Sequence, residues 1–246
     1  AMRTANPALK ASTFTRTTVV PESESMTIQG TVNKAFLILL VLVGAAYTTW
    51  GLTFQGRDVA LPLMGLGLIG GLIVGIVTVV KHEWAPITAP IYGALQGFFL
   101  GGVSAVANMM YPGVVPQAVG LTFGTAFCLL LAYKSGLIKA TENFKLGVAA
   151  ATGGIFAVYM VSFIMGMFGA SVPFIHSSGV IGIGFSLFVV VLAALNLVLD
   201  FDFIEQGAET HAPKHMEWYA AFGLMVTLIW LYLEILRLLM KLRSND

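Results

Sequence analysis

The side chains best suited to chemistry lie near the end of the chain, in or beside two long apolar segments. Asp200, Asp202 and Glu205 follow one of these segments, and Glu217 precedes the next. Ionisable groups in or beside hydrocarbon are costly, so they usually have a partner or a function. Carboxylates at such a position can gate a cation pathway or sense protons, because burial raises a carboxyl pKa and a nearby cation lowers it.

Asp200 is placed by counting along its helix. From a start at Ser178, a rise of about 1.5 Å per residue puts Asp200 roughly 33 Å along, at the inner membrane interface. Asn196 lies one turn earlier on the same face, and Glu205 about a turn and a half later. The alternative is that the helix leaves the membrane here and its acids are hydrated, which position alone slightly favours. If these acids instead gate a pathway at the interface, Asp200, Asn196 and Glu205 are candidates for lining it.

Glu234 lies well inside the last apolar segment, with Arg237 three residues further on. Residues at this spacing are neighbours on a helix, and a long Arg side chain can extend toward the interface. We therefore predict an intrahelical ion pair between Glu234 and Arg237.

Other chemistry has little support. His211 and His215 have the spacing of a two-histidine metal pair, but Pro213 between them favours a hydrated loop, so we predict no firm metal site and no cofactor. The sequence has no Ser-His-Asp or Cys-His arrangement, no phosphate loop and no zinc-protease pattern. It therefore does not predict an enzyme.

The elements that must position these residues are membrane-spanning helices. Of the 246 residues, 57% are hydrophobic and 10% are charged, against about 25% charged in soluble domains. The formal net charge of +1 excludes the basic footprint of a nucleic-acid-binding protein. The composition predicts an all-α, polytopic membrane protein whose first partner is the lipid bilayer.

Seven segments have the roughly 20 apolar residues that a spanning helix needs. They are Ala35–Leu52, Ala60–Val80, Pro86–Met109, Val114–Tyr133, Leu146–Gly169, Ser178–Leu199 and Trp218–Leu242. We predict a disordered polar tail over residues 1–33, one transmembrane domain over residues 34–242 and a short C-terminal tail over residues 243–246.

The basic residues indicate the orientation, since Lys and Arg favour the cytoplasmic side. One side has nine: Arg3, Lys10, Arg16, Lys34, Lys81, Lys134, Lys139, Lys145 and Lys214. The other has four: Arg57, Arg237, Lys241 and Arg243. This predicts a cytoplasmic N terminus, although the basic C-terminal cluster argues mildly against it.

Glycines recur every four residues in two neighbouring spans. The rows are Gly67, Gly71 and Gly75, then Gly93, Gly97 and Gly101. Small residues on one helix face allow close approach of another helix, so interhelical packing is favoured over a substrate-lining groove.

Three stretches together resemble the Bax inhibitor family, most closely its bacterial, actinobacterial-type branch. They are Tyr92-Gly-Ala-Leu-Gln-Gly-Phe-Phe-Leu-Gly101, Leu199-Asp-Phe-Asp-Phe-Ile204 and Leu231-Tyr-Leu-Glu-Ile-Leu-Arg-Leu-Leu239. The resemblance covers about Lys34 to Lys241. It implies a seven-helix bundle with the last helix central, in the cell membrane.

In studied relatives the resemblance implies a pH-sensitive calcium leak controlled by two aspartates. The first corresponds to Asp200, which could bind calcium transiently, but the second falls on Thr227. Two nearby carboxylates cannot both ionise readily, and that coupling makes a proton sensor. The switch is therefore lost here unless Asp202, Glu205 or Glu217 takes the second place, and Glu217 is the favoured substitute.

Two functions remain open. The first is a pH-sensitive cation leak, with calcium as the ion. The second is a non-transporting regulator that binds a membrane protease or another membrane complex, as some bacterial relatives do. The Thr at position 227 favours the second, and the Ser/Thr-rich N-terminal tail could then be the contact.

Overall fold

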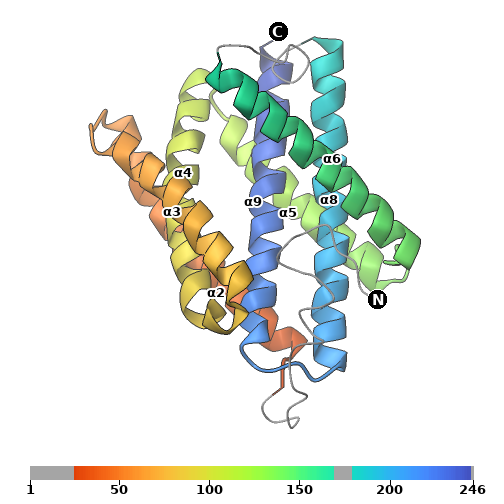
Figure 1. Ribbon diagram of the computed structural model, residues 1–246. Helices are drawn as coiled ribbons and strands as arrows, with labels where there is room; N and C mark the ends of the chain where they lie inside the picture. Colours follow the sequence, from red (N-terminus) through yellow and green to blue (C-terminus); the bar gives the residue numbers. More distant parts are fainter. Residues whose placement is uncertain (1–24, 169–178, 245–246) are drawn as a thin grey trace. The chain divides into compact units, whose positions relative to one another are not determined.

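The computed structural model describes residues 25–168 and 179–244. Within these residues seven helices are long and apolar enough to cross a membrane (Figure 1). They are α2 (Ile28–Phe54), α3 (Ala60–Val80), α4 (Ala85–Met110), α5 (Val114–Lys134), α6 (Glu142–Met167), α8 (Val180–Glu209) and α9 (Met216–Arg243), and a short 3-10 helix, η2 (His82–Trp84), joins α3 to α4. The predicted all-α membrane fold is confirmed.

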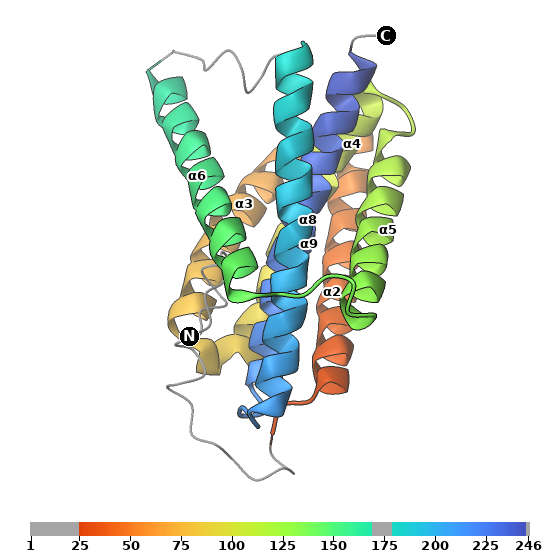
Figure 2. The same ribbon diagram turned by 90° about the vertical axis from the view of Figure 1, so that its right-hand side faces the viewer.

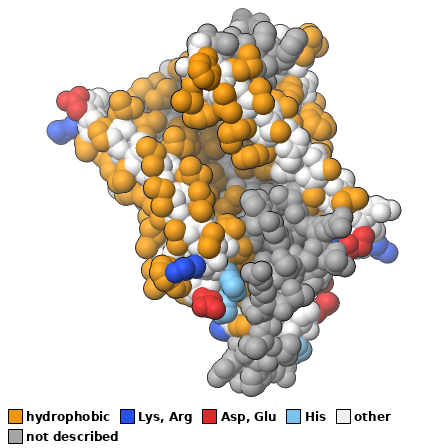
Figure 3. Space-filling view, viewed as in Figure 1, with side chains coloured by type: hydrophobic (Ala, Val, Ile, Leu, Met, Phe, Trp, Pro, Cys, Tyr) orange, Lys and Arg blue, Asp and Glu red, His pale blue; other side chains and the backbone are white. Residues whose placement is uncertain are grey.

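The outward-facing side chains explain why these helices need a membrane. Large apolar residues are exposed along the spans other than α9, among them Phe36, Leu72, Phe127 and Phe163, which are 60%, 64%, 60% and 67% exposed. Figure 3 shows hydrophobic side chains over most of the described surface in that view, with few charged groups. Water would penalise such a surface, whereas lipid accommodates it.

The chain divides into two compact units. The first contains α5, α6, α8 up to Leu199 and α9 from Thr227 onward (Figure 2). Its core joins Val148 and Ile155 of α6 to Val189, Leu192 and Leu199 of α8.

The second unit contains α2, α3, η2 and α4, with the end of α8 from Asp200 and the start of α9 up to Val226. Phe203, Met216, Tyr219 and Phe222 are almost fully buried in it. The ring of Tyr92, on α4, meets Phe222 edge-on at a centroid distance of 4.9 Å. The last helix thus supplies core residues to both units. Of its most apolar 18-residue stretch, 56% is buried, the largest share among the seven described spans.

Close packing of α4 in the second unit depends on glycines. A Cβ on Gly97 would lie 2.3 Å from the carbonyl oxygen of Leu42, and one on Gly101 would lie 2.2 Å from that of Ala46, both on α2. A Cβ on Gly67 would lie 2.4 Å from the carbonyl oxygen of Leu95. The two glycine rows are therefore helix contacts and not a groove.

The remaining members of the rows differ in how tightly they pack. A Cβ on Gly71 would lie 2.6 Å from the amide nitrogen of Gln96, and one on Gly93 would lie 2.8 Å from a methyl carbon of Ile38. At Gly75 the nearest atom, in the ring of Tyr92, would be 3.4 Å away, an ordinary contact. Gly75 is thus the one position of the six where a methyl group would fit.

Two helix ends differ most from the predicted ones. Helix α2 begins at Ile28, inside the segment predicted as a disordered tail, because the side chain of Thr27 caps it by accepting from the Gly30 amide. Residues 1–24 of that predicted tail lie outside the described residues. Helix α8 continues to Glu209, ten residues past its predicted end, so Asp200 lies inside the helix and not at its exit.

Candidate functional site

The predicted acids at the end of α8 occupy three different environments. Asp200 is fully buried, with 0% of its surface exposed. Asp202 is half-buried and accepts a hydrogen bond from Nε2 of Gln206 at 2.5 Å, whereas Glu205 is exposed. Hydration explains Glu205 but not Asp200, which is therefore the carboxylate whose position needs a functional explanation.

Asn196 has a structural role in the first unit. Its side-chain nitrogen donates to Oγ1 of Thr152 on α6 at 2.9 Å and to the carbonyl oxygen of Leu192 at 2.9 Å. Asn196 is only 2% exposed. Thr227, on α9, is also 2% exposed. Asn196 thus links α8 to α6 through a buried hydrogen bond.

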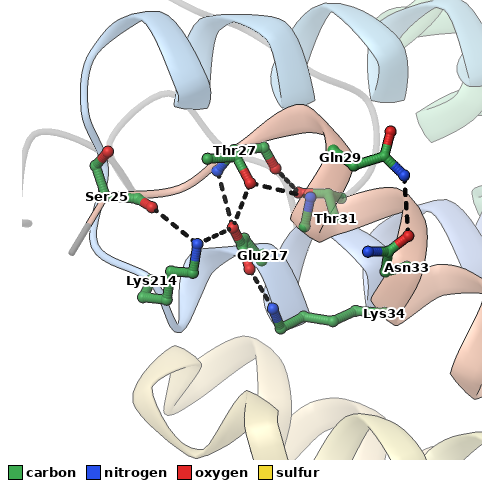
Figure 4. Close-up of polar contacts among 9 residues, drawn as sticks. Ser25, Thr27, Gln29, Thr31, Asn33, Lys34, Lys214 and Glu217 are labelled. Carbon is green, nitrogen blue, oxygen red and sulfur yellow. Dashed lines mark hydrogen bonds and ion pairs between the residues drawn. The ribbon is translucent and has the colours of Figure 1, made fainter. Parts of the chain in front are cut away.

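Glu217 is at the centre of the most extensive polar cluster of the second unit (Figure 4). The residue is fully buried. One carboxylate oxygen, Oε1, accepts from the Thr27 amide at 2.9 Å, from the Thr27 hydroxyl at 2.8 Å and from Nζ of Lys214 at 2.9 Å. The other oxygen forms an ion pair with Nζ of Lys34. Four donors therefore compensate the cost of burying this carboxylate.

Neighbouring backbone contacts hold the cluster together. The Met26 amide donates to the carbonyl oxygen of Ala212 at 2.6 Å, and Ser25 forms an isolated bridge with Pro213. Nζ of Lys214 also reaches the Ser25 carbonyl oxygen at 3.4 Å. The segment Ser25–Thr27 is thus fastened to the connection between α8 and α9, and we call this arrangement the N-terminal latch.

The contacts of Glu217 bear on its predicted role as the second carboxylate of a proton sensor. As a substitute for the second family aspartate, it would need to share a proton with another carboxylate. Its oxygens instead accept from Lys34, Lys214 and Thr27, which favour the ionised form. The three-residue spacing of Lys214 and Glu217 in the sequence is that of an ion pair. The contacts from Thr27 and Lys34 are not visible in the sequence, because these residues lie more than 180 positions away.

A second polar cluster lies in the first unit. The carboxylate of Glu234 pairs with Arg237 at 3.0 Å and accepts from the Tyr159 hydroxyl at 2.9 Å. Arg237 also donates to the Tyr159 oxygen at 2.8 Å, and its guanidinium lies over the Tyr159 ring. Glu234 is buried while the side chain of Arg237 is 44% exposed, so the arginine extends outward as its length allows. Tyr159, from α6, was not anticipated.

The arrangement of potential metal ligands is a separate feature of the described residues. Within residues 25–168 and 179–244, no group of three or more His, Cys, Asp and Glu side chains is arranged to hold a metal ion. His211 is exposed, has a positive φ of 51° and is hydrogen-bonded to the Glu209 carbonyl oxygen through Nδ1. His176 lies outside the described residues.

In the described part of the chain, the seven apolar helices, with the buried carboxylates of Glu217 and Glu234 in ion pairs, define a polytopic membrane protein. A family model described as Bax inhibitor 1 like matches residues 6–244. The chain therefore belongs to the Bax inhibitor 1 like family. No curated protein and no solved structure matches it.

Proposed function

We propose that the protein is a cation leak of the cell membrane, with calcium as its ion and Asp200 as the controlling carboxylate. The observation that carries this proposal is the complete burial of Asp200 inside α8. Burying a carboxylate within a membrane span is costly, and such groups commonly mark ion pathways. Carboxylate oxygen is also the ligand type that Ca²⁺ prefers.

Calcium flux into reconstituted vesicles tests the proposal. We expect flux with the unaltered protein and at least a tenfold reduction in Asp200→Asn, which keeps the size of the side chain but removes its charge. Glu205→Gln, at the exposed acid on the same helix, is the matched control and should retain flux. A protein that passes no calcium at any pH, or whose flux is unchanged by Asp200→Asn, would contradict the proposal.

The pH response should differ from that of a coupled aspartate pair. The family resemblance places the second acid at Thr227, and Glu217 is bound by lysines. A single carboxylate titrates with an ordinary one-proton profile, whereas two coupled ones give two apparent pKa values. The flux should therefore follow a one-proton pH profile, and a profile with two apparent pKa values would contradict control by a single carboxylate.

The second candidate is a regulator that binds a membrane protease or another membrane complex. The N-terminal latch supports it, because the latch fixes the point from which residues 1–24 continue. Deleting residues 2–24 leaves the latch residues in place and should abolish co-purification of the partner. Retained co-purification would exclude the tail as the contact.

The same proposal places the N terminus in the cytoplasm. The nine basic residues on that side support the orientation, and Lys34, Lys81 and Lys214 among them lie at or near helix ends in the second unit. A single cysteine introduced at Ser135, near Lys134, should be protected from an impermeant thiol reagent in whole cells. One at Arg57 should be labelled. Both are introduced after Cys128→Ala.

A further inference from the structure

Two of the four histidines lie side by side in the second unit, although 133 positions separate them. His82 begins η2, in the connection between α3 and α4. His215 closes the connection between α8 and α9. Their ring centroids are 5.5 Å apart, and the rings are tilted by 47°.

This separation is close to that of two imidazoles on one metal ion. Metal–nitrogen bonds of about 2.0–2.1 Å at a tetrahedral angle put the ring centroids roughly 5 Å apart. A stacked pair would instead have its rings nearly parallel. The tilt of 47° turns the two rings out of the parallel arrangement.

His215 also has a buried nitrogen with no protein partner. Among the described residues, Nε2 of His215 is enclosed and accepts or donates no hydrogen bond. An unsatisfied buried polar atom costs about 1–3 kcal/mol, so native structures rarely leave one without a reason. An imidazole nitrogen in this state can coordinate a metal ion.

We propose that His82 and His215 bind a transition-metal dication of the Zn²⁺ class. Imidazole nitrogen is a preferred ligand of Zn²⁺, Ni²⁺ and Cu²⁺ and a poor one for Ca²⁺. Because no third His, Cys, Asp or Glu side chain in the described part of the chain is already in place, water completes the coordination. Glu83, next to His82, adds negative charge that acts on His215.

The consequence of metal binding is a clamp within the second unit. The ion ties the α3–α4 connection to the α8–α9 connection, which also carries Pro213 and Lys214 of the N-terminal latch. Binding to the folded state alone raises the free energy of unfolding by mass action. The proposal is independent of the calcium leak, since it involves neither Asp200 nor an ion pathway.

Zn²⁺ binding to detergent-solubilised protein without a histidine tag tests the site. Competition with a chromophoric chelator should show one Zn²⁺ per chain, and Zn²⁺ should raise the melting temperature. His82→Gln and His215→Gln should each weaken binding at least tenfold and abolish the shift. His211→Gln, in the same connection as His215 but exposed, is the matched control and should bind as the unaltered protein does.

Three results would overturn the proposal. They are no binding by the unaltered protein, undiminished binding by His82→Gln, or loss of binding by His211→Gln, which would indicate the pair His211 and His215 instead. Co²⁺ provides a readout that a folding defect cannot imitate. His82→Cys should still bind Co²⁺ and gain sulfur-to-cobalt charge-transfer absorption, and failure to gain it would exclude His82 as a ligand.

Discussion

Glu217 and Lys34 form an ion pair across 183 positions of the chain. Lys34 lies in the first span, α2, and Glu217 in the first turn of the last span, α9. The lysine side chain is 19% exposed and the glutamate side chain is fully buried. Nζ of Lys34 also lies over the Trp218 ring, at 5.6 Å from its centroid, so the ammonium has both the carboxylate and an aromatic ring as neighbours.

Glu217→Gln should destabilise the protein strongly. The change removes the charge that Lys34 and Lys214 neutralise and leaves two cations facing a neutral amide. Breaking a buried ion pair by removing one partner typically costs about 3–5 kcal/mol. Thermal unfolding in detergent measures the effect. Glu205→Gln, at an exposed carboxylate, should change the melting temperature little, and equal losses in both variants would contradict the role of the latch.

Gly30→Ala should damage the same latch by another route. A Cβ at Gly30 would lie 2.1 Å from Oε1 of Glu217, so the carboxylate must move away from Thr27. Gly44→Ala on the same helix is the matched control, because nothing lies within 4 Å of its Cβ position. Alanine is favoured over glycine in a helix by about 1 kcal/mol, so Gly44→Ala should raise the melting temperature in thermal unfolding, whereas Gly30→Ala should lower it. Opposite signs for the two variants are expected.

Stability should fall as the pH drops below about 6.5 because of His215. Burial and the nearby His82 lower the pKa of His215 below its usual 6.5, and Glu83 partly opposes them. The unfolded chain then binds more protons than the folded one between the folded pKa and 6.5, so unfolding becomes easier as the pH falls through that window. Denaturation with a metal chelator present should show this slope, and His215→Gln should flatten it. An equal slope in the variant would contradict the assignment.

Tyr159 should be coupled energetically to Glu234. The hydroxyl donates to the carboxylate and accepts from Arg237, so Tyr159→Phe removes two hydrogen bonds in the first unit. Hydrogen bonds to charged groups contribute about 1.5–3 kcal/mol. A double-mutant cycle with Glu234→Gln should give a coupling energy of about 1 kcal/mol or more from unfolding measurements. Tyr133→Phe in α5 supplies a cycle partner outside this cluster, and additivity is expected there.

Local spacing was enough to predict some of these features. The seven spans follow from runs of apolar residues, and an i,i+3 spacing accounts for Glu234 and Arg237, which lie 3.0 Å apart. The glycine rows predict a packing face, because four-residue spacing fixes one side of a helix. The rows do not identify the helix that packs against them. The structure shows that Gly97 and Gly101 pack against α2.

Contacts between distant parts of the chain were beyond this kind of prediction. The sequence pattern places Thr27 in the polar tail and Lys34 at the first position of the transmembrane domain, because their partner Glu217 lies more than 180 residues away. The end of α8 was misplaced for a related reason. Its last ten residues are too polar for a spanning pattern, yet Gln206 and Asp202 pair one turn apart and help to continue the helix.

The N-terminal latch also constrains how the protein is made. The Thr27 amide and hydroxyl find their acceptor 190 residues later, on Glu217. At a synthesis rate of about 5–20 residues per second, Thr27 precedes its partner by roughly 10–40 s. The start of α2 therefore leaves the ribosome long before Glu217, the acceptor for Thr27, has been synthesised. The segment Ser25–Thr27 is thus among the last to reach its final contacts, after six spans have been synthesised.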